Sequence, residues 1–301
     1  MPIFVKSAQK NFRFLVLLTK RTRRWRILVS CRRFCGKQEN SRLPDRESLM
    51  PIGPSFNVDT LLEWTPESDP DAIYSRATIS LADREGGFVV NPLANPEAKL
   101  MLCSLANSDH DHTSAQGTES FLSYSFNYWQ YADSFVYWSG SEEGLICCPT
   151  GEFTDAAHTN GVPVVATLGF PWGPGSGYVE QVQKFVQKAE DGSFPVADKL
   201  IEVMDYYGFD GYFFNQESYG CSSAEGELID EMMRYMHEKR PDMLISWYDS
   251  MLPGGTVWYQ NAVNDSNKDF MMDSEDGTRA VDEFFMNYNW YSTEVEETID
   301  T

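Results

Sequence analysis

Two side chains of different chemistry lie close together at the end of an aromatic segment. Asn215 and Glu217 follow residues 208–214, which read Gly-Phe-Asp-Gly-Tyr-Phe-Phe. Alternate residues of a β-strand point to the same face, so these two side chains share one face about 7 Å apart along the strand. A glutamate can donate a proton and recover it. An asparagine cannot replace a nucleophilic carboxylate, but it can orient a substrate group by hydrogen bonds.

This pair suits a substrate that supplies its own nucleophile. Most glycosidases use two carboxylates, one of which serves as nucleophile or base. In a 2-acetamido sugar, the acetamide oxygen can instead attack the anomeric carbon and form an oxazoline. Asn215 then orients the acetamide, while Glu217 protonates the leaving oxygen and later deprotonates water, with retention of configuration. Taken alone, the same residues also fit an asparagine that caps a strand and a glutamate on the surface.

The pair needs a sheet to position it, and the pattern from residue 99 onward predicts one. Apolar runs alternate with amphipathic segments, which is typical of βα units and a parallel sheet. Helices are expected where apolar side chains recur at helical spacing, in residues 178–189, 196–207 and 225–239. The expected strands are residues 99–104, 134–138, 162–170, 209–215, 243–248 and 283–288.

This alternation predicts an α/β fold of the (β/α)8 TIM-barrel type. The pair then lies at the carboxyl end of a strand, where the active sites of such barrels form. Six βα units are visible, two fewer than the eight of a complete barrel, so we expect an incomplete barrel. We divide the chain into a basic N-terminal segment (1–50), expected to be disordered, an irregular lead-in (51–98) with a candidate strand at 77–81, and a partial catalytic barrel (99–301).

The charge is strongly negative and unevenly distributed. The net charge is −21, yet residues 1–46 hold 13 of the 24 Lys and Arg residues and only Glu39 and Asp45 as acids. That segment therefore carries +11 and the remaining residues −32. Such an acidic body excludes nucleic acid and anionic membrane surfaces as partners. The apolar run 14–18 is too short for a signal peptide or a membrane span.

Neither a metal nor another cofactor is expected. The six cysteines lack zinc-type spacing, and we expect free thiols rather than a disulfide scaffold. The segment 109–112, Asp-His-Asp-His, is interpreted as a polar loop, with a metal site as the alternative. His158 and His237 are expected to be helix residues rather than ligands. The proton transfers described above need no metal.

The segment 208–217 resembles the chitinase-type motif Phe-Asp-Gly-x-Asp-x-Asp-x-Glu. Asn215 replaces the last Asp of that motif and Phe213 replaces an earlier one, which argues against a chitinase of this type.

A broader resemblance covers about residues 95–290. The chain is similar to glycoside hydrolase family 85, the endo-β-N-acetylglucosaminidases acting on N-glycans, and to its bacterial members in particular. The blocks that carry the likeness are residues 125–140, 155–164, 192–217, 247–251 with 258–261, and 285–290.

The resemblance implies roles for individual residues. Asn215 matches the family's acetamide-orienting asparagine, Glu217 its general acid/base and Tyr248 the tyrosine that assists at the acetamide. Trp258 matches an aromatic residue that lines the sugar groove, and Tyr259 takes that position if the loop register differs by one. The residues expected to bind the substrate are Trp258, Tyr259, Asn261, Asn287 and Trp290. For Tyr248 and Trp290, the alternative is a purely structural core aromatic.

The resemblance also implies a substrate and a compartment. It implies hydrolysis of the GlcNAc-β-1,4-GlcNAc bond in the chitobiose core of N-linked glycans, without a cofactor. Export is expected from the bacterial likeness, and the cytoplasm is the alternative because no signal peptide is recognisable. Tyr219 departs from the family, which often carries an acidic residue there.

Two other functions stay open at this stage. The pattern ends before the last two barrel strands, so the chain is expected to be a truncated form. An unclosed sheet exposes strand edges, which favours an inactive fragment or a glycan-binding remnant as the main alternative. A chitinase-like hydrolase is the weaker one.

Overall fold

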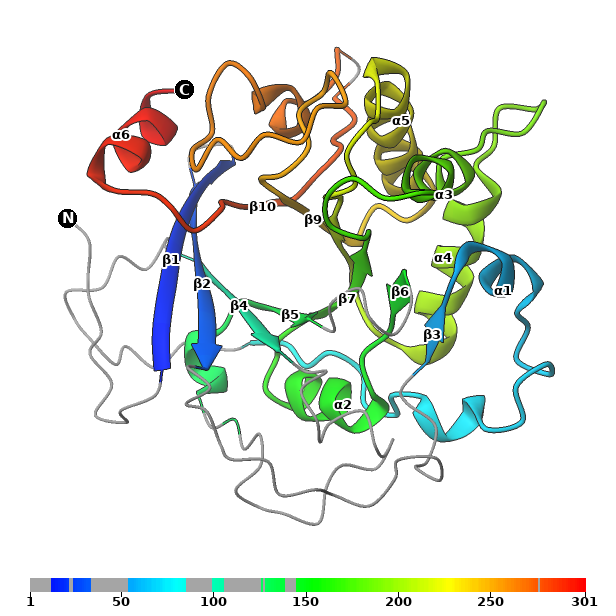
Figure 1. Ribbon diagram of the computed structural model, residues 1–301. Coiled ribbons are helices and arrows are strands. Elements are labelled where there is room, and N and C mark those ends of the chain that lie inside the picture. The colour runs from blue at the N-terminus through cyan, green and yellow to red at the C-terminus, as the bar shows by residue number, and fades with distance from the viewer. Residues whose placement is uncertain are drawn as a thin grey trace, which may run out of the picture.

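The computed structural model describes residues 12–21, 24–33, 54–84, 99–105, 126, 128–138, 145–275 and 277–301. The described strands form one sheet of ten strands. They are β1 (Phe12–Arg21), β2 (Arg24–Arg33), β3 (Ser55–Phe56), β4 (Lys99–Leu105), β5 (Ser134–Trp138), β6 (Ile146–Cys147), β7 (Val164–Gly169), β8 (Gly211–Asn215), β9 (Leu244–Tyr248) and β10 (Glu283–Phe285). Helices lie outside the strands, which surround a central region in Figure 1. The fold is α/β, as predicted.

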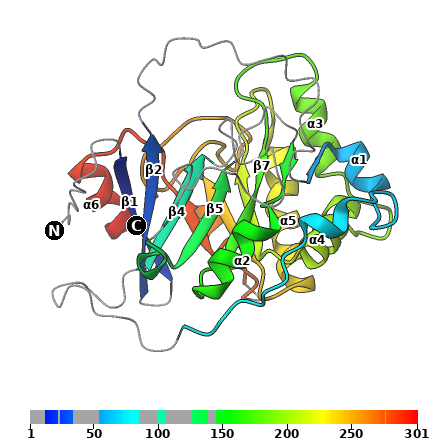
Figure 2. The ribbon, with the colours of Figure 1, turned by 90° about the horizontal axis from the view of Figure 1, so that it is seen from below.

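All six strands predicted from the alternating pattern are present. β4, β5, β7, β8, β9 and β10 lie side by side in chain order and pair in parallel. β7 begins at Val164 and β10 ends at Phe285, so both are shorter than predicted. In Figure 2 the arrowheads of β2, β5 and β7 point the same way. The carboxyl ends of the parallel strands therefore lie at one end of the sheet.

Residues 1–50 are expected to be disordered, yet two strands form in this segment. β1 and β2 are an antiparallel pair, and β2 pairs in parallel with β4. β1 and β10, which end the path of paired strands, approach each other. The expectation fails because the apolar runs 14–18 and 27–29 contain aliphatic residues that favour strands, even between arginines.

The lead-in packs into the same core as the sheet. β3 pairs antiparallel with β6, and β6 pairs antiparallel with β7. The short helix α1 (Val58–Glu63) begins at a capping box formed by Asn57 and Thr60. Leu61 and Trp64 are buried in the main hydrophobic cluster.

The candidate strand at residues 77–81 is not formed. The Ala77 amide donates to the carbonyl of Tyr207, at the end of a helix. The backbone amides of Thr78 and Ile79 donate to the Asp155 carboxylate at 2.7 and 2.8 Å. A helix end and a side chain thus accept the backbone hydrogen bonds that a neighbouring strand would otherwise accept. The alternating pattern of apolar residues alone was therefore not enough to form a strand.

The three predicted helices are present as α3 (Tyr178–Phe185), α4 (Pro195–Tyr207) and α5 (Ser223–Lys239). α4 begins with a proline and ends at Gly208, whose φ of 82° is left-handed, as the sequence signals predict. Of two further helices, α2 (Gly151–Thr159) contains His158, which is predicted to be a helix residue, and α6 (Ser292–Asp300) is not among the predicted helices. Short 3-10 turns form at η1 (Ala72–Ser75), η3 (Trp129–Tyr131) and η4 (Lys268–Met271).

Side chains of β8 alternate between the two faces of the sheet, as predicted. Tyr212 donates its hydroxyl to a carbonyl of α4 at 2.7 Å, and Phe214 packs against a ring of α3. Phe213 points the other way. Its ring contacts Trp138 of β5 and Phe285 of β10, with centroids 5.7 and 5.6 Å away. These strands lie on either side of β8, so Phe213 faces the inside of the curved sheet.

Aspartates that directly precede a strand bind the start of the neighbouring strand. The pairs are Asp133 with the Leu100 amide, Asp210 with the Val164 amide and Asp282 with the Ile245 amide, at 2.7–2.9 Å. Asp210 also contacts His158 of α2 at 2.8 Å, and Asp282 contacts His237 of α5 at 3.0 Å. Both histidines are helix residues, as predicted. These contacts fix the amino-terminal ends of the strands, opposite the end that carries Asn215.

The pair of His158 and Asp210 is expected to make stability depend on pH. Burial opposes the charged imidazolium, but the hydrogen bond and charge of Asp210 outweigh it and raise the pKa of His158 above 6.5. The pair therefore stabilises the fold fully below that pH, and the contribution is lost as pH rises through the raised pKa. The Tm difference between wild type and His158→Gln should be largest near about pH 6 and shrink toward about pH 9. A difference that grows with pH would contradict this.

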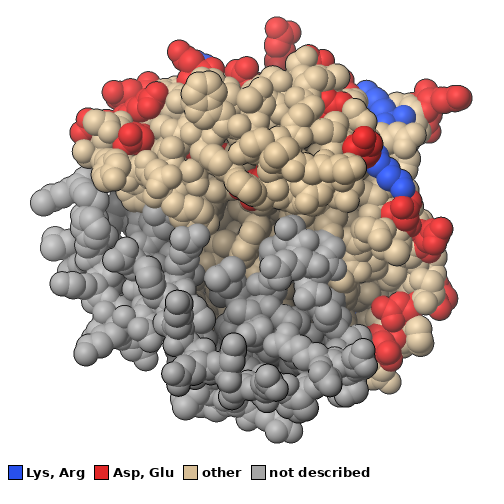
Figure 3. Space-filling model, in the orientation of Figure 1, with Lys and Arg blue, Asp and Glu red and all other residues tan. Residues whose placement is uncertain are grey.

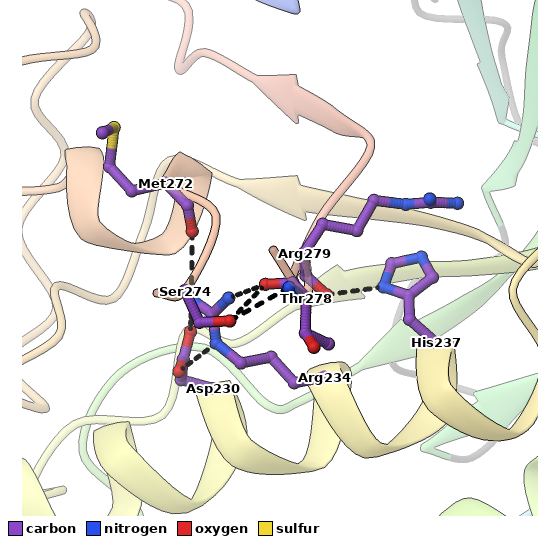
Figure 4. A network of polar contacts seen from close by, with 7 residues as sticks. All are labelled: Asp230, Arg234, His237, Met272, Ser274, Thr278 and Arg279. Atoms are coloured by element: carbon purple, nitrogen blue, oxygen red, sulfur yellow. Dashed lines mark hydrogen bonds and ion pairs between the residues drawn. The ribbon is translucent and has the colours of Figure 1, made fainter. Parts of the chain in front are cut away.

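A polar network anchors the connection between β9 and β10 to α5 (Figure 4). Arg234 donates two hydrogen bonds to the Asp230 carboxylate, from Nε at 2.8 Å and from Nη2 at 3.0 Å. It also donates to the carbonyl oxygens of Met272 and Thr278. His237 bonds another carbonyl of this connection at 2.9 Å. The connection is thereby held against the helix, which sets where β10 begins and where the residues after it lie.

On the face shown in Figure 3, acidic side chains outnumber basic ones among the described charged residues. In Figure 3, Asp and Glu gather along the margin of the face, whereas Lys and Arg occupy a small area. This agrees with the charge of −32 that the sequence assigns to residues 47–301. Within the described residues, no helix is both long and apolar enough to cross a membrane.

Candidate active site

Asn215 and Glu217 meet at the carboxyl end of β8. Asn215 is the last residue of the strand and is 4% exposed. Its Nδ2 donates to Glu217 Oε2 at 2.7 Å, so the side chains converge from backbone positions about 7 Å apart. This hydrogen bond uses the NH2 group of the Asn215 side chain. Asn215 Oδ1, the acceptor side, has no protein partner in the described part of the chain.

Tyr259 binds the other oxygen of the same carboxylate. Its hydroxyl donates to Glu217 Oε1 at 2.6 Å. Burial and this bond to a carboxylate raise the pKa of Tyr259, so the phenol stays a proton donor. Its neighbour Trp258 is 68% exposed. Of the two loop registers that the sequence leaves open, the structure brings Tyr259 to Glu217 and leaves Trp258 on the surface.

A second set of hydrogen bonds joins the ends of β9 and β10. The Tyr248 hydroxyl donates to Asn287 Oδ1 at 2.8 Å, and Asn287 Nδ2 donates to Asn261 Oδ1 at 3.0 Å. Asn261 Oδ1 also accepts the backbone amide of Asn289 at 3.0 Å. Burial raises the pKa of Tyr248 well above its ordinary value, which keeps this hydroxyl protonated. Three expected site residues thus form one continuous chain.

Aromatic rings link the two sets of polar groups. The Tyr248 ring lies 6.0 Å from that of Tyr259 and 6.3 Å from that of Phe213 (centroid distances). Phe213 is 2% exposed. It stands where a chitinase-type motif has an aspartate, so the chain has an apolar ring at that position in place of a further carboxylate.

The loops after β7 and β8 are paired through their backbones. The Gly173 amide donates to the Glu217 carbonyl at 2.9 Å, and the Tyr219 amide donates to the Gly173 carbonyl at 3.0 Å. Ser250, after β9, donates its hydroxyl to the Gln216 carbonyl at 2.6 Å. The position of Glu217 is therefore set by loops on both sides of β8.

Sequence analysis did not single out two residues that the structure brings to the site. Trp172, after β7, is 65% exposed and its ring lies 6.1 Å from that of Tyr219. Asp249, directly after β9, is 2% exposed and accepts the backbone amide of Asn261. Both follow a predicted strand closely, which is the signal that could have identified them.

Trp290 differs from the other expected site residues. It is partly buried and packs against the main hydrophobic cluster. Its described contacts are those of a core aromatic, so a contact between Trp290 and a sugar stays a prediction.

Within the described ranges, no group of three or more His, Cys, Asp or Glu side chains could hold a metal ion. Among the described residues, no disulfide joins any two of Cys103, Cys147, Cys148 and Cys221. The polar segment 109–112 lies outside the described residues.

Comparison with known proteins places this site in a family. The model of glycosyl hydrolase family 85 matches residues 106–301, which is more than half of the chain. The chain belongs to glycosyl hydrolase family 85. The segment that matches family 85 contains all eight expected site residues, together with Trp172 and Asp249.

The chain is also similar to curated proteins and to a solved structure. The cytosolic endo-beta-N-acetylglucosaminidase of Mus musculus is 32% identical over 257 residues, covering 83% of this chain and 32% of that protein. That of Gallus gallus is 31% identical over 245 residues, covering 80% and 31%. The chain thus spans about a third of the length of these relatives. The glycoside hydrolase domain of Endo-D from Streptococcus pneumoniae R6 matches with a TM-score of 0.76 at 36% identity, covering 84% of this chain and 40% of that one.

Proposed function

We propose that this family 85 protein is an endo-β-N-acetylglucosaminidase that hydrolyses the GlcNAc-β-1,4-GlcNAc bond of the N-glycan chitobiose core. The observation that carries the proposal is the bond between one amide and one carboxylate, Asn215 and Glu217, at the end of β8. A site with a single carboxylate at the reacting bond needs a nucleophile from elsewhere. The acetamide of GlcNAc supplies one.

The proposed reaction has two steps. In the first, the acetamide oxygen attacks C1 of the sugar, the bond from C1 to the bridging oxygen breaks, and Glu217 gives its proton to that oxygen. The products are an oxazolinium ion, which keeps the N–H proton of the acetamide, and a sugar with a free hydroxyl. In the second, Glu217 takes a proton from water, which attacks C1 and opens the oxazolinium ring to restore the acetamide with its N–H. Both steps invert C1, so the configuration is retained.

Asn215 and Tyr248 are assigned to the acetamide. Because Asn215 Nδ2 is bonded to Glu217, its Oδ1 is the atom that can accept the acetamide N–H. That hydrogen bond holds the group in place and increases the electron density on its oxygen, which makes the oxygen a better nucleophile. The Tyr248 hydroxyl, held by Asn287 at 2.8 Å, is assigned to the other side of the acetamide.

N-linked glycans of glycoproteins or glycopeptides are the proposed partners. Exposed aromatic side chains near Glu217 support this, because flat rings pack against the apolar faces of sugars. They are Trp172, Tyr219 and Trp258. The acidic surface suits a neutral ligand and disfavours nucleic acid.

We extend the proposal to the architecture and the compartment. The parallel order of β2, β4, β5, β7, β8, β9 and β10 supports the (β/α)8 barrel type. The antiparallel β1, which stands where a complete barrel has an eighth parallel strand, supports an incomplete form of it. The names of the Mus musculus and Gallus gallus relatives support the cytosol, the alternative of the sequence analysis, over export.

The test is release of glycan from a denatured N-glycoprotein, followed by mass spectrometry. Wild-type protein should leave one GlcNAc on each asparagine, and Glu217→Gln should slow release by about 10²- to 10⁴-fold, the usual contribution of a general acid/base. Glu238→Gln changes an exposed glutamate of α5 and should match wild type. A wild-type chain that is folded by circular dichroism yet releases nothing would overturn the proposal in favour of a remnant.

Trp258 and Tyr259 are expected to differ in a kinetic test. Tyr259→Phe removes a hydrogen bond to a carboxylate, worth about 1.5–3 kcal/mol, and should lower kcat about tenfold or more. Trp258→Ala removes an exposed stacking surface, so it should raise KM and leave kcat close to wild type. Steady-state rates on one N-glycopeptide measure both variants. The opposite pattern would assign the contact with Glu217 to Trp258.

A further inference from the structure

Four donors converge on the carboxylate of Asp249. Oδ1 accepts the Gln260 amide at 3.1 Å and the side-chain amide of Asn267 at 3.2 Å. Oδ2 accepts the backbone amide of Asn261, and that of Asn287 at 3.4 Å. These donors come from three segments: the loop after β9, η4 and the end of β10. Asp249 is therefore the point at which those segments are joined.

The chemistry of this point requires a carboxylate. An ionised carboxylate only accepts hydrogen bonds and can accept about four, whereas an amide would turn an NH2 group toward some of the same donors. Burial is costly for the charge and raises the pKa of Asp249 to about 7, even though its hydrogen bonds act in the opposite direction. A leucine or asparagine would avoid this cost if only packing were needed.

The segment held by Asp249 has an unusual backbone. Asn261 has a φ of 59°, the only positive φ at a non-glycine residue in the described part of the chain. Such a conformation persists where surrounding contacts enforce it. Here it lets the Asn261 backbone amide meet Asp249 while its side chain accepts Asn287 Nδ2. Asn287 in turn accepts the Tyr248 hydroxyl.

We propose that Asp249 is a positioning residue, which fixes Asn261 and Asn287 so that Asn287 holds the Tyr248 hydroxyl in the orientation used for the substrate acetamide. This inference rests on the proposed function and deepens it. Asp249 itself touches no reacting atom. Its effect on the reaction passes through the two asparagines to Tyr248.

The first measurement does not need activity. Hydrogen exchange of the amides of Gln260 and Asn261, followed by mass spectrometry, should be at least about tenfold faster for one of the two in Asp249→Asn than in wild type, because one carboxylate oxygen becomes an NH2 group and the amide that faced it loses its acceptor. Asp282→Asn is the matched control. It also replaces a buried aspartate that binds a backbone amide, but at the opposite end of the strands, and it should leave these two amides unchanged. Equal exchange in Asp249→Asn and wild type overturns the proposal.

The second measurement is kinetic. Asp249→Asn should lower kcat by about 10- to 100-fold with KM within about threefold, as expected for a misplaced catalytic group. Asp282→Asn should lower Tm and keep kcat within about twofold. In the double variant with Tyr248→Phe, Asp249→Asn should cause little further loss, because both changes remove the same contribution. Full additivity overturns the proposal.

A further variant covers the case in which Asp249→Asn does not fold. Asn261→Gly keeps the left-handed backbone and its amide but removes the side chain that contacts Asn287. It should reproduce the loss of kcat without a loss of Tm, and unchanged kcat overturns the proposal. If wild type itself releases no glycan, the proposed function fails. The exchange rates of Gln260 and Asn261 then still decide whether Asp249 fixes this loop.

Discussion

Replacing Asn215 with alanine is expected to slow glycan hydrolysis by about 10²- to 10³-fold, the range for removing one preorganised polar group from a transition state. In the free protein Nδ2 is bonded to Glu217 at 2.7 Å, so Oδ1 is the atom available for the acetamide. Without it the acetamide loses its orientation, and oxazoline formation slows. Glu217 keeps its second partner, Tyr259, and hence remains in place.

A preformed sugar oxazoline makes this test more specific. That substrate has already passed the first step, so Asn215→Ala should convert it at a rate within about tenfold of wild type. Glu217→Gln should be impaired with both substrates, because both steps use its proton transfer. Initial rates on the two substrates, measured by mass spectrometry, give the comparison. If Asn215→Ala loses both reactions equally, Asn215 serves the structure of the site rather than the acetamide.

Replacing Gly211 with alanine is expected to destabilise the protein by about 3–5 kcal/mol, from overpacking combined with backbone strain. Gly211 begins β8 with a φ of 155°. A Cβ there would lie 1.9 Å from the Leu244 carbonyl oxygen of β9. Since that oxygen belongs to the backbone of a paired strand, relief requires the two strands to separate. This explains the glycine of the Phe-Asp-Gly sequence in terms of close packing between strands.

Gly254→Ala is the matched control for that measurement. No atom lies within 4 Å of a Cβ built at Gly254, and its φ is not positive. Its free energy of unfolding should stay within about 0.5 kcal/mol of wild type. Urea unfolding followed by circular dichroism measures both variants. Equal midpoints for Gly211→Ala and wild type would contradict the close approach of β8 and β9.

Much of the fold could be predicted because its signals are local. Apolar runs and amphipathic segments identify six strands (β4, β5, β7, β8, β9 and β10) and three helices (α3 to α5) without any knowledge of contacts. β1 and β2 could not be predicted in this way, because the arginines around their apolar runs resemble a solvated segment. β6 has two residues, too few to form a pattern. α6 lies in a polar run and begins at a capping box of Tyr291 and Glu294, an uncommon form of this signal.

In the candidate site, too, some residues could be predicted from the sequence and others could not. Asn215 and Glu217 could be predicted, because strand geometry relates residues two positions apart. The choice between Trp258 and Tyr259 could not be made, since the loop after β9 has no period that sets its register. Asp249 depends on partners that lie 11 to 38 positions further along the chain. Only the folded chain brings such partners together.

The bonds between successive loops bear on how such a protein can change in evolution. Gly173 is bonded to Glu217, Ser250 to Gln216, and Asn287 to Asp249. A loop transplanted from a relative would therefore arrive without the neighbour that shaped it. A change in ligand preference is expected to arise more readily from substitution of side chains that project from these loops, such as Trp172, or from exchange of several loops at once. The residues that bond one loop to the next are expected to tolerate the fewest substitutions.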